Sequence, residues 1–182
     1  LKNLHSFADA GIVTSNDADL IKKLNLIKNH GLMDRSTCSE WGLNCRLDEL
    51  QAALLRVQLP ILESWTEERR KIAHFYNSNL SKKVIVPLEK ANEKHVYQTY
   101  VIRTDQRNEL KEFLNANGVE ALIHYPVPIH LQPAAKNLSH KRGDFPVVEQ
   151  LADEILSLPL YPGMPLEFQE RVVSLILEFF GG

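Results

Sequence analysis

The sequence has little of what marks several large protein classes. Its 182 residues contain two cysteines, Cys38 and Cys45, and neither lies in a Cys-x-x-Cys or Cys/His zinc pattern. No apolar run approaches the roughly 20 residues that a membrane-spanning helix needs. The 21 basic and 23 acidic residues are well mixed, so the chain lacks the basic stripe that binds nucleic acid. We therefore expect a cytoplasmic protein with neither a nucleic-acid partner nor a membrane partner.

The first residues also lack the usual signals of a chain start. There is no initiator methionine, and no basic segment precedes an apolar core as it does in a secretory signal peptide. Lys2 stands almost at the terminus, and Asp9-Ala10-Gly11 leads into a short apolar run. We expect this stretch to be an interior segment of a longer protein.

What is present is typical of a globular α/β protein, with 44% hydrophobic and 24% charged residues. The β-branched run at 11–14 predicts a strand, and apolar residues at helical spacing predict a helix over 18–29, closed by Gly31. A long loop is expected at 31–45. From Arg46 the pattern is strongly helical, with a break at Pro60, which cannot donate a backbone hydrogen bond.

Beyond Leu80 short strands and helices alternate. The change of character predicts a boundary near Pro60, with residues 1–59 as the edge of a larger domain and residues 60–182 as a small α/β domain. The predicted strands cover 84–87, 97–102 and 119–124, and the predicted helices cover 105–117, 146–156 and 166–180.

Three places carry residues suited to chemistry. Lys2 precedes a glycine-bearing turn and a predicted strand, and a lysine at such a rim, with a lowered pKa, can form an imine with an aldehyde cofactor. Asn44 lies just before the helix that follows Arg46, where it is either an N-cap residue or an anion ligand. His124 and His130 flank a proline-rich loop, but two histidines without a third ligand do not predict a metal site.

Six stretches of the sequence, in unchanged order, resemble the DegT/DnrJ/EryC1/StrS family of sugar aminotransferases. In that family the active lysine is followed by Asn-Leu and then by Asp-(Ala/Gly)-Gly, and a later motif reads Gly-x-Asn-x-Arg-Leu-Asp-Glu-Leu-Gln-Ala-Ala. The matching stretches are KNLHSFADAGIVTSNDADL (2–20), LIKNHG (26–31), GLNCRLDELQAALLRVQL (42–59), VYQTYVIR (96–103), IHYPVPIHLQP (123–133) and LSLPLYPGM (156–164).

The resemblance implies the C-terminal half of a fold-type I aminotransferase that depends on pyridoxal 5'-phosphate. It would comprise the edge of the large domain plus the small C-terminal α/β domain, and it would begin one residue before the active lysine. His5 and Ala8 stand where the family usually has glycine or another small residue. Because the segments that hold the rest of the cofactor are missing, we expect the isolated chain to be inactive.

The reaction implied by the resemblance is transamination. Lys2 would bind the cofactor and then move a proton as base and acid, with glutamate as the amino donor. The amino group would pass to a keto group of a nucleotide-linked deoxysugar, and the likeness of residues 123–133 favours C3 of the sugar. Such products serve amino-sugar and cell-surface polysaccharide biosynthesis.

The resemblance also assigns roles to three other residues. Asn44 would bind the cofactor phosphate of the neighbouring subunit in a homodimer with shared active sites. Tyr125 and His130 would contact the nucleotide sugar or line its entrance, and no metal is expected. Two alternatives stay open: a non-catalytic α/β binding or assembly module derived from such an enzyme, and a related sugar dehydratase, although those carry histidine in place of Lys2.

Overall fold

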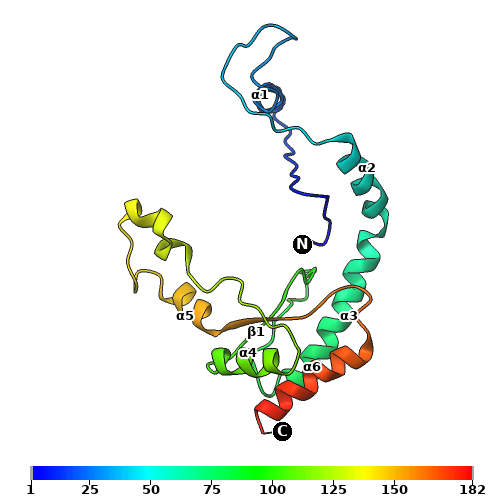
Figure 1. The fold of residues 1–182 in the computed structure, drawn as a ribbon, viewed down its shortest axis with the longest axis vertical. Helices are drawn as coiled ribbons and strands as arrows, with labels where there is room; N and C mark the ends of the chain where they lie inside the picture. The colour runs from blue at the N-terminus through cyan, green and yellow to red at the C-terminus, as the bar shows by residue number, and fades with distance from the viewer. Residues whose placement is uncertain (1, 182) are drawn as a thin grey trace. The chain divides into compact units, whose positions relative to one another are not determined.

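The computed structural model describes residues 2–181, which form two compact units that divide between Leu62 and Glu63. The first unit holds α1, a long loop and α2, and the second holds a small sheet with most of the helices (Figure 1). No helix within residues 2–181 combines the length and the apolar character that crossing a membrane requires.

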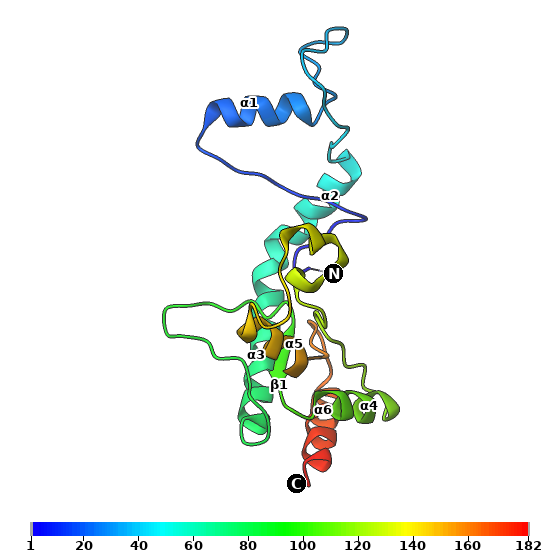
Figure 2. The same cartoon turned by 90° about the vertical axis from the view of Figure 1, so that its left-hand side faces the viewer.

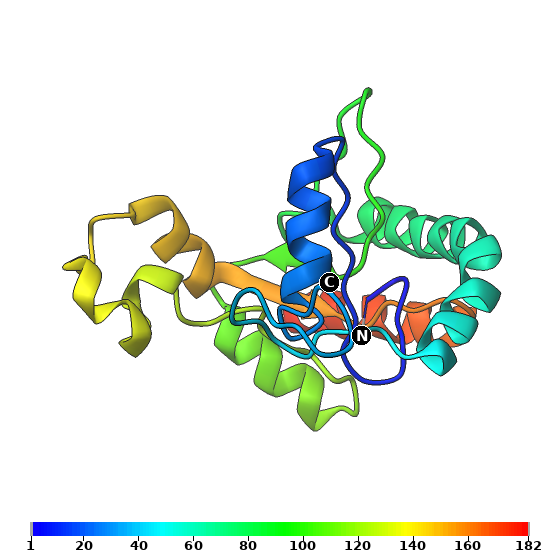
Figure 3. The same cartoon turned by 90° about the horizontal axis from the view of Figure 1, so that it is seen from above.

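Helix α1 (Ala18–Ile27) begins where the sequence predicts it. The carboxylate of Asp17 caps it, because Oδ1 accepts the N–H groups of Asp19 at 2.9 Å and Leu20 at 3.1 Å. The helix ends slightly earlier than predicted, where the left-handed backbone of His30 and Gly31 turns the chain into the loop of residues 31–45 (Figure 3).

The strand predicted at residues 11–14 is not formed, so this prediction is wrong. None of these residues pairs with another segment within residues 2–181. Ile12 and Val13 are 89% and 63% exposed. β-branched residues favour a strand only where a neighbouring strand supplies hydrogen bonds and packing, and the first unit supplies neither.

Helix α2 (Glu49–Gln58) begins with a capping box, in which the Asp48 N–H donates to Oε1 of Gln51 at 3.1 Å. It leads into the 3₁₀ turn η1 (Leu59–Ile61) and then into α3 (Leu62–Leu80). The predicted break at Pro60 is therefore confirmed as a tightened turn.

The sheet of the second unit joins segments that lie far apart in the sequence. Strands β1 (Tyr100–Arg103) and β2 (Ile155–Leu158) pair antiparallel, with Tyr100 opposite Leu158. Ile85 pairs with the end of β1, and Leu122 pairs with β2, each at a single residue. The order across the sheet is therefore Ile85, β1, β2, Leu122.

Three helices complete the second unit: α4 (Arg107–Ala116), α5 (Pro146–Glu154) and α6 (Leu166–Phe179). Two short 3₁₀ turns, η2 (Ile129–Leu131) and η3 (Pro133–Leu138), precede α5. The core lies between α3, the sheet, α4 and α6. Its largest fully buried side chains are Tyr76, Leu80, Tyr97, Tyr100, Ile102, Leu110, Leu114, Leu156 and Ile176.

The predicted strands of this unit are confirmed only in part. Those at 84–87 and 119–124 reduce to single paired residues, and the strand predicted at 97–102 begins at Tyr100. The helix predicted at 146–156 stops at Glu154, and the chain continues into β2, which the sequence pattern did not predict. A short apolar run has no periodicity that distinguishes a strand from the end of a helix. Whether it forms a strand therefore depends on pairing with another strand.

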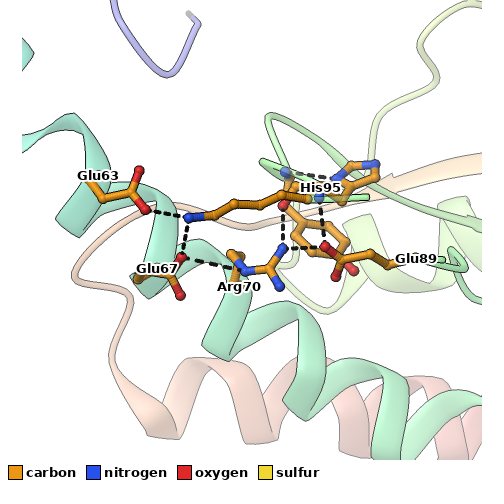
Figure 4. Close-up of polar contacts among 7 residues, drawn as sticks. Glu63, Glu67, Arg70, Glu89 and His95 are labelled. Atoms are coloured by element: carbon orange, nitrogen blue, oxygen red, sulfur yellow. Dashed lines mark hydrogen bonds and ion pairs between the residues drawn. The ribbon is translucent and has the colours of Figure 1, made fainter. Parts of the chain in front are cut away.

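A network of charges ties the long loop between α3 and β1 (Figure 2) back to α3. Arg70 donates to Oε1 of Glu89 at 2.6 Å and to the carbonyl of His95 at 2.9 Å (Figure 4). Lys94 reaches back to Glu63 and to Glu67 on α3. The hydrogen bond from Arg70 holds the pKa of the Glu89 carboxyl below its usual value, so this pair is ionised near neutrality.

Candidate functional site

The backbone just after Lys2 is held by two glutamines of α2. Nε2 of Gln51 donates to the carbonyls of Phe7 at 2.6 Å and Asp9 at 3.2 Å. Oε1 of Gln58 accepts the His5 N–H at 3.5 Å. Gln51 and Gln58 lie two turns apart, on one face of the helix. Helix α2 therefore fixes the segment that follows Lys2, while the Lys2 side chain is exposed.

Asn44 is placed by a short antiparallel contact with the end of α1. Its backbone lies opposite Asn29, and its neighbours donate to the last carbonyls of the helix, Leu43 to Ile27 at 2.7 Å and Cys45 to Lys28 at 2.9 Å. These are carbonyls that a helix end leaves without an internal partner. The loop thus supplies hydrogen-bond donors for the last carbonyl groups of α1. The same hydrogen bonds fix the position of the Asn44 backbone.

Two glycines make this close contact possible. A Cβ on Gly42 would lie 2.4 Å from the Gly31 nitrogen and 2.5 Å from the Ile27 carbonyl oxygen. A Cβ on Gly31 would lie 1.6 Å from the carbonyl oxygen of Glu40, and Gly31 also has a φ of +70°. Both positions require glycine, since a side chain at either would collide with backbone.

The side-chain amide of Asn44 has a fixed orientation. Nε of Arg46 donates to Oδ1 of Asn44 at 3.0 Å, and NH1 of Arg46 donates to Oδ1 of Asn29 at 3.4 Å. With its oxygen held by Arg46, Asn44 presents its NH2 group as a donor.

A cavity of about 790 Å3 in the first unit is lined by both Asn44 and Asp9. Its walls also include exposed apolar side chains, among them Ile12 and Val13. An amide donor on such a concave surface suits an anionic group of a small molecule. The first unit therefore brings the Asp9 turn and Asn44 to one cavity, with the Lys2 segment fixed on α2.

Tyr125 and His130 lie in the second unit and differ sharply in exposure. Tyr125 is 71% exposed, with its ring edge-on to His124. The His130 side chain is 8% exposed, its Nε2 lies 2.9 Å from Oε1 of Glu149, and its ring packs on Phe145. Tyr125 is thus available to a ligand, whereas His130 is engaged within the fold.

The Glu149 side chain binds the backbone of the loop that precedes α5. Its carboxylate accepts the N–H of Gly143 on both oxygens, at 2.8 and 2.9 Å, and the N–H of Phe145 at 3.3 Å. Burial by itself raises the pKa of this carboxyl, but the hydrogen bonds from Gly143, His130 and Phe145 outweigh it, so the pKa lies below its usual value.

The sequence did not single out Gln51, Gln58 or Glu149. For the glutamines a signal was present, since two amides seven residues apart stand among the apolar residues of α2. For Glu149 there was none, because its partners come from loops. Within residues 2–181, no three His, Cys, Asp or Glu side chains gather in a way that could hold a metal ion.

Comparison with known proteins matches the chain to one family. The sequence model of the DegT/DnrJ/EryC1/StrS aminotransferase family matches residues 1–177. A pleiotropic regulatory protein of Geobacillus stearothermophilus is 40% identical over an alignment 183 residues long, which covers 98% of this chain and 49% of that protein. The dTDP-3-amino-3,4,6-trideoxy-alpha-D-glucose transaminase of Streptomyces venezuelae is 36% identical over 98% of this chain and 48% of its own length.

The fold is also similar to that of a solved structure. The structure of S. venezuelae DesV in complex with a ketimine intermediate superposes with a TM-score of 0.92 at 35% identity, covering 97% of this chain and 48% of that one. The chain thus spans about half the length of the relatives it matches.

Proposed function

Because the chain belongs to the DegT/DnrJ/EryC1/StrS aminotransferase family, we propose that it supplies about half of a sugar aminotransferase that depends on pyridoxal 5'-phosphate. Residues 1–59 would belong to the large cofactor-binding domain, and residues 60–182 would form the small C-terminal domain. The division of the chain into two compact units supports this arrangement. The single observation that carries the proposal is the family match over residues 1–177, which includes Lys2 and Asn44.

The substrate we propose is a nucleotide-linked keto-deoxysugar that receives its amino group at C3 from glutamate. The support comes from the S. venezuelae relative, whose name specifies a dTDP-linked 3-amino sugar. The product would be an amino sugar for a cell-surface polysaccharide. We place the reaction in the cytoplasm, and the free thiols of Cys38 and Cys45 are compatible with that reducing compartment.

The residues of the first unit fit the proposed cofactor. The NH2 group of Asn44 is a donor suited to the cofactor phosphate of the neighbouring subunit, and the exposed Lys2 amine is available for covalent attachment of its own subunit's cofactor. When bound, pyridoxal 5'-phosphate supplies an electron sink for the carbanion chemistry of transamination. The Lys2 amine would take the proton from the Cα of the amino donor as base and would deliver it, as acid, to C4' of the cofactor.

In the second unit we propose that Tyr125 contacts the nucleotide sugar. Its exposed ring and hydroxyl can stack and hydrogen-bond at the same time. We propose that His130 lines this region and, through Glu149, holds the loop that precedes α5 in place.

We further propose a homodimer with shared active sites. Large apolar side chains lie exposed in the loop before α2, where Met33 is 66%, Trp41 97% and Leu43 63% exposed. Leu50 and Val57 on α2 are 73% and 70% exposed. Exposed apolar surface of this kind marks a protein contact.

A second candidate function is a non-catalytic binding or assembly module. It is favoured by the relative from G. stearothermophilus, which is named as a regulatory protein. The two candidates differ in what they require of Lys2, since only the enzyme needs its amine.

The experiment that tests the enzyme is to identify the lysine that carries the cofactor. The full-length protein is loaded with pyridoxal 5'-phosphate, reduced with borohydride, digested and mapped by mass spectrometry. We expect the pyridoxyl label on Lys2, and we expect Lys2→Ala to abolish transamination. Lys23→Ala, which removes an exposed lysine of α1, is the matched control and should keep full activity. A label on another lysine, or an active Lys2→Ala variant, would contradict the proposal.

A further inference from the structure

We propose that Arg46 is a positioning residue that decides which end of the Asn44 amide faces the cofactor phosphate. This inference rests on the proposed function, in which Asn44 binds that phosphate. It concerns how the Asn44 amide, which is neutral and lies on a loop, is oriented before binding so that its NH2 group faces the phosphate.

The two ends of an asparagine amide have nearly the same shape but opposite chemistry. The NH2 group donates two hydrogen bonds, whereas the oxygen only accepts them and repels an anion. A half-turn of the side chain exchanges the two. Arg46 carries donors only, so its bond to Asn44, from Nε to Oδ1 at 3.0 Å, exists in one of the two orientations.

The guanidinium is itself fixed by a second amide. NH1 of Arg46 donates to Oδ1 of Asn29 at 3.4 Å, and the backbones of Asn29 and Asn44 lie opposite each other in the antiparallel contact at the end of α1. One planar group therefore connects two side-chain amides whose backbones are already paired. Lysine has the same charge but no planar fork, so it cannot hold both.

The test separates the contribution of the phosphate from that of the rest of the cofactor. Dissociation constants of pyridoxal 5'-phosphate and of pyridoxal, which lacks the phosphate, are measured with the full-length protein by absorbance. Arg46→Gln is expected to weaken binding of the phosphorylated form about tenfold, as for one misdirected hydrogen bond to a charged group. Binding of pyridoxal should not change.

Two further variants distinguish positioning from simple attraction. Asn44→Ala should weaken phosphate binding to a similar extent, and adding Arg46→Gln to Asn44→Ala should cause no further loss, since Arg46 acts through Asn44. Arg46→Lys should remain impaired, because the charge alone does not orient the amide. Arg35→Gln, which removes the same charge from the exposed part of the loop, is the control and should match the unchanged protein.

Three results would overturn the inference while leaving the proposed function intact. They are full phosphate affinity in Arg46→Lys, an additional loss in the double variant, and an equal loss for pyridoxal and its phosphate in Arg46→Gln. If the unchanged protein binds neither compound, the proposed function itself fails.

Discussion

Glu149 is a buried charge whose partners are mostly backbone. A carboxylate that accepts two N–H groups and faces a histidine nitrogen is stabilised in its ionised form, as the lowered pKa of Glu149 indicates. A carboxyl whose pKa is depressed by folding stabilises the protein above its unfolded pKa. That contribution is lost as the pH falls through the folded pKa.

We predict that Glu149→Gln lowers the melting temperature of the protein by several degrees near neutral pH. The amide keeps the size of the side chain but loses its charge, and its NH2 group would face the N–H groups of Gly143 and Phe145. The difference between the two proteins should shrink as the pH falls below the ordinary carboxyl range. Thermal melts measured from pH 7 to pH 3 check this. Glu112→Gln, at an exposed position of α4, is the control.

At the scale of elements, the close contact between Gly31 and Gly42 allows the loop of residues 31–45 to pack against the end of α1. This contact fixes the loop backbone that carries Asn44. Large apolar side chains of the loop, such as Met33 and Trp41, are exposed, and backbone hydrogen bonds join the loop to the end of α1. Loops that present functional groups are commonly held by a rigid scaffold in this way.

We predict that Gly42→Ala disrupts the contact between the loop and α1 and lowers the free energy of unfolding by about 1–3 kcal/mol, as for an overpacked site. The new Cβ would be forced against the Gly31 nitrogen and the Ile27 carbonyl. Amide hydrogen exchange should therefore accelerate at Leu43, whose N–H bonds that carbonyl. Gly11→Ala is the matched control, because nothing lies within 4 Å of the position its Cβ would take. Unchanged exchange at Leu43 in Gly42→Ala would contradict the prediction.

The elements also show what the sequence can predict. Helices α1 and α4 followed from local signals, the cap at Asp17 and the left-handed Gly118 after the helix. Strand β2 did not, because its state depends on pairing with β1, which is distant in sequence. At the site, the family likeness pointed to Asn44, but the orientation of its amide by Arg46 is a property of the fold.

At the scale of the whole molecule, many large apolar side chains remain exposed on the first unit. Leu50 and Val57 stand out because they lie on one face of α2, seven residues apart. An uncovered apolar stripe on a helix is normally buried by another element or another chain.

We predict that the 182-residue chain, prepared alone, self-associates and does not transaminate. Sedimentation velocity over a range of concentrations should show a weight-average coefficient that rises with concentration. Replacing both Leu50 and Val57 by glutamate should reduce the association. Leu88→Glu is the control, since Leu88 is 85% exposed but lies on the loop before β1. A monomer at all concentrations, or turnover of a keto-sugar nucleotide with glutamate, would contradict the prediction.

The pairing of β1 with β2 has a consequence for how the protein is made. As the chain leaves the ribosome, α3, β1 and α4 are available well before β2, so the backbone edge of β1 that pairs with β2 has no partner until residues 155–158 are made. The core also needs Ile176 of α6, which is fully buried and is synthesised after β2. Contacts between segments distant in sequence form late and slowly. The earlier helices of this unit are therefore expected to form during translation, while its sheet closes only after β2 has been synthesised and its core is complete only with α6.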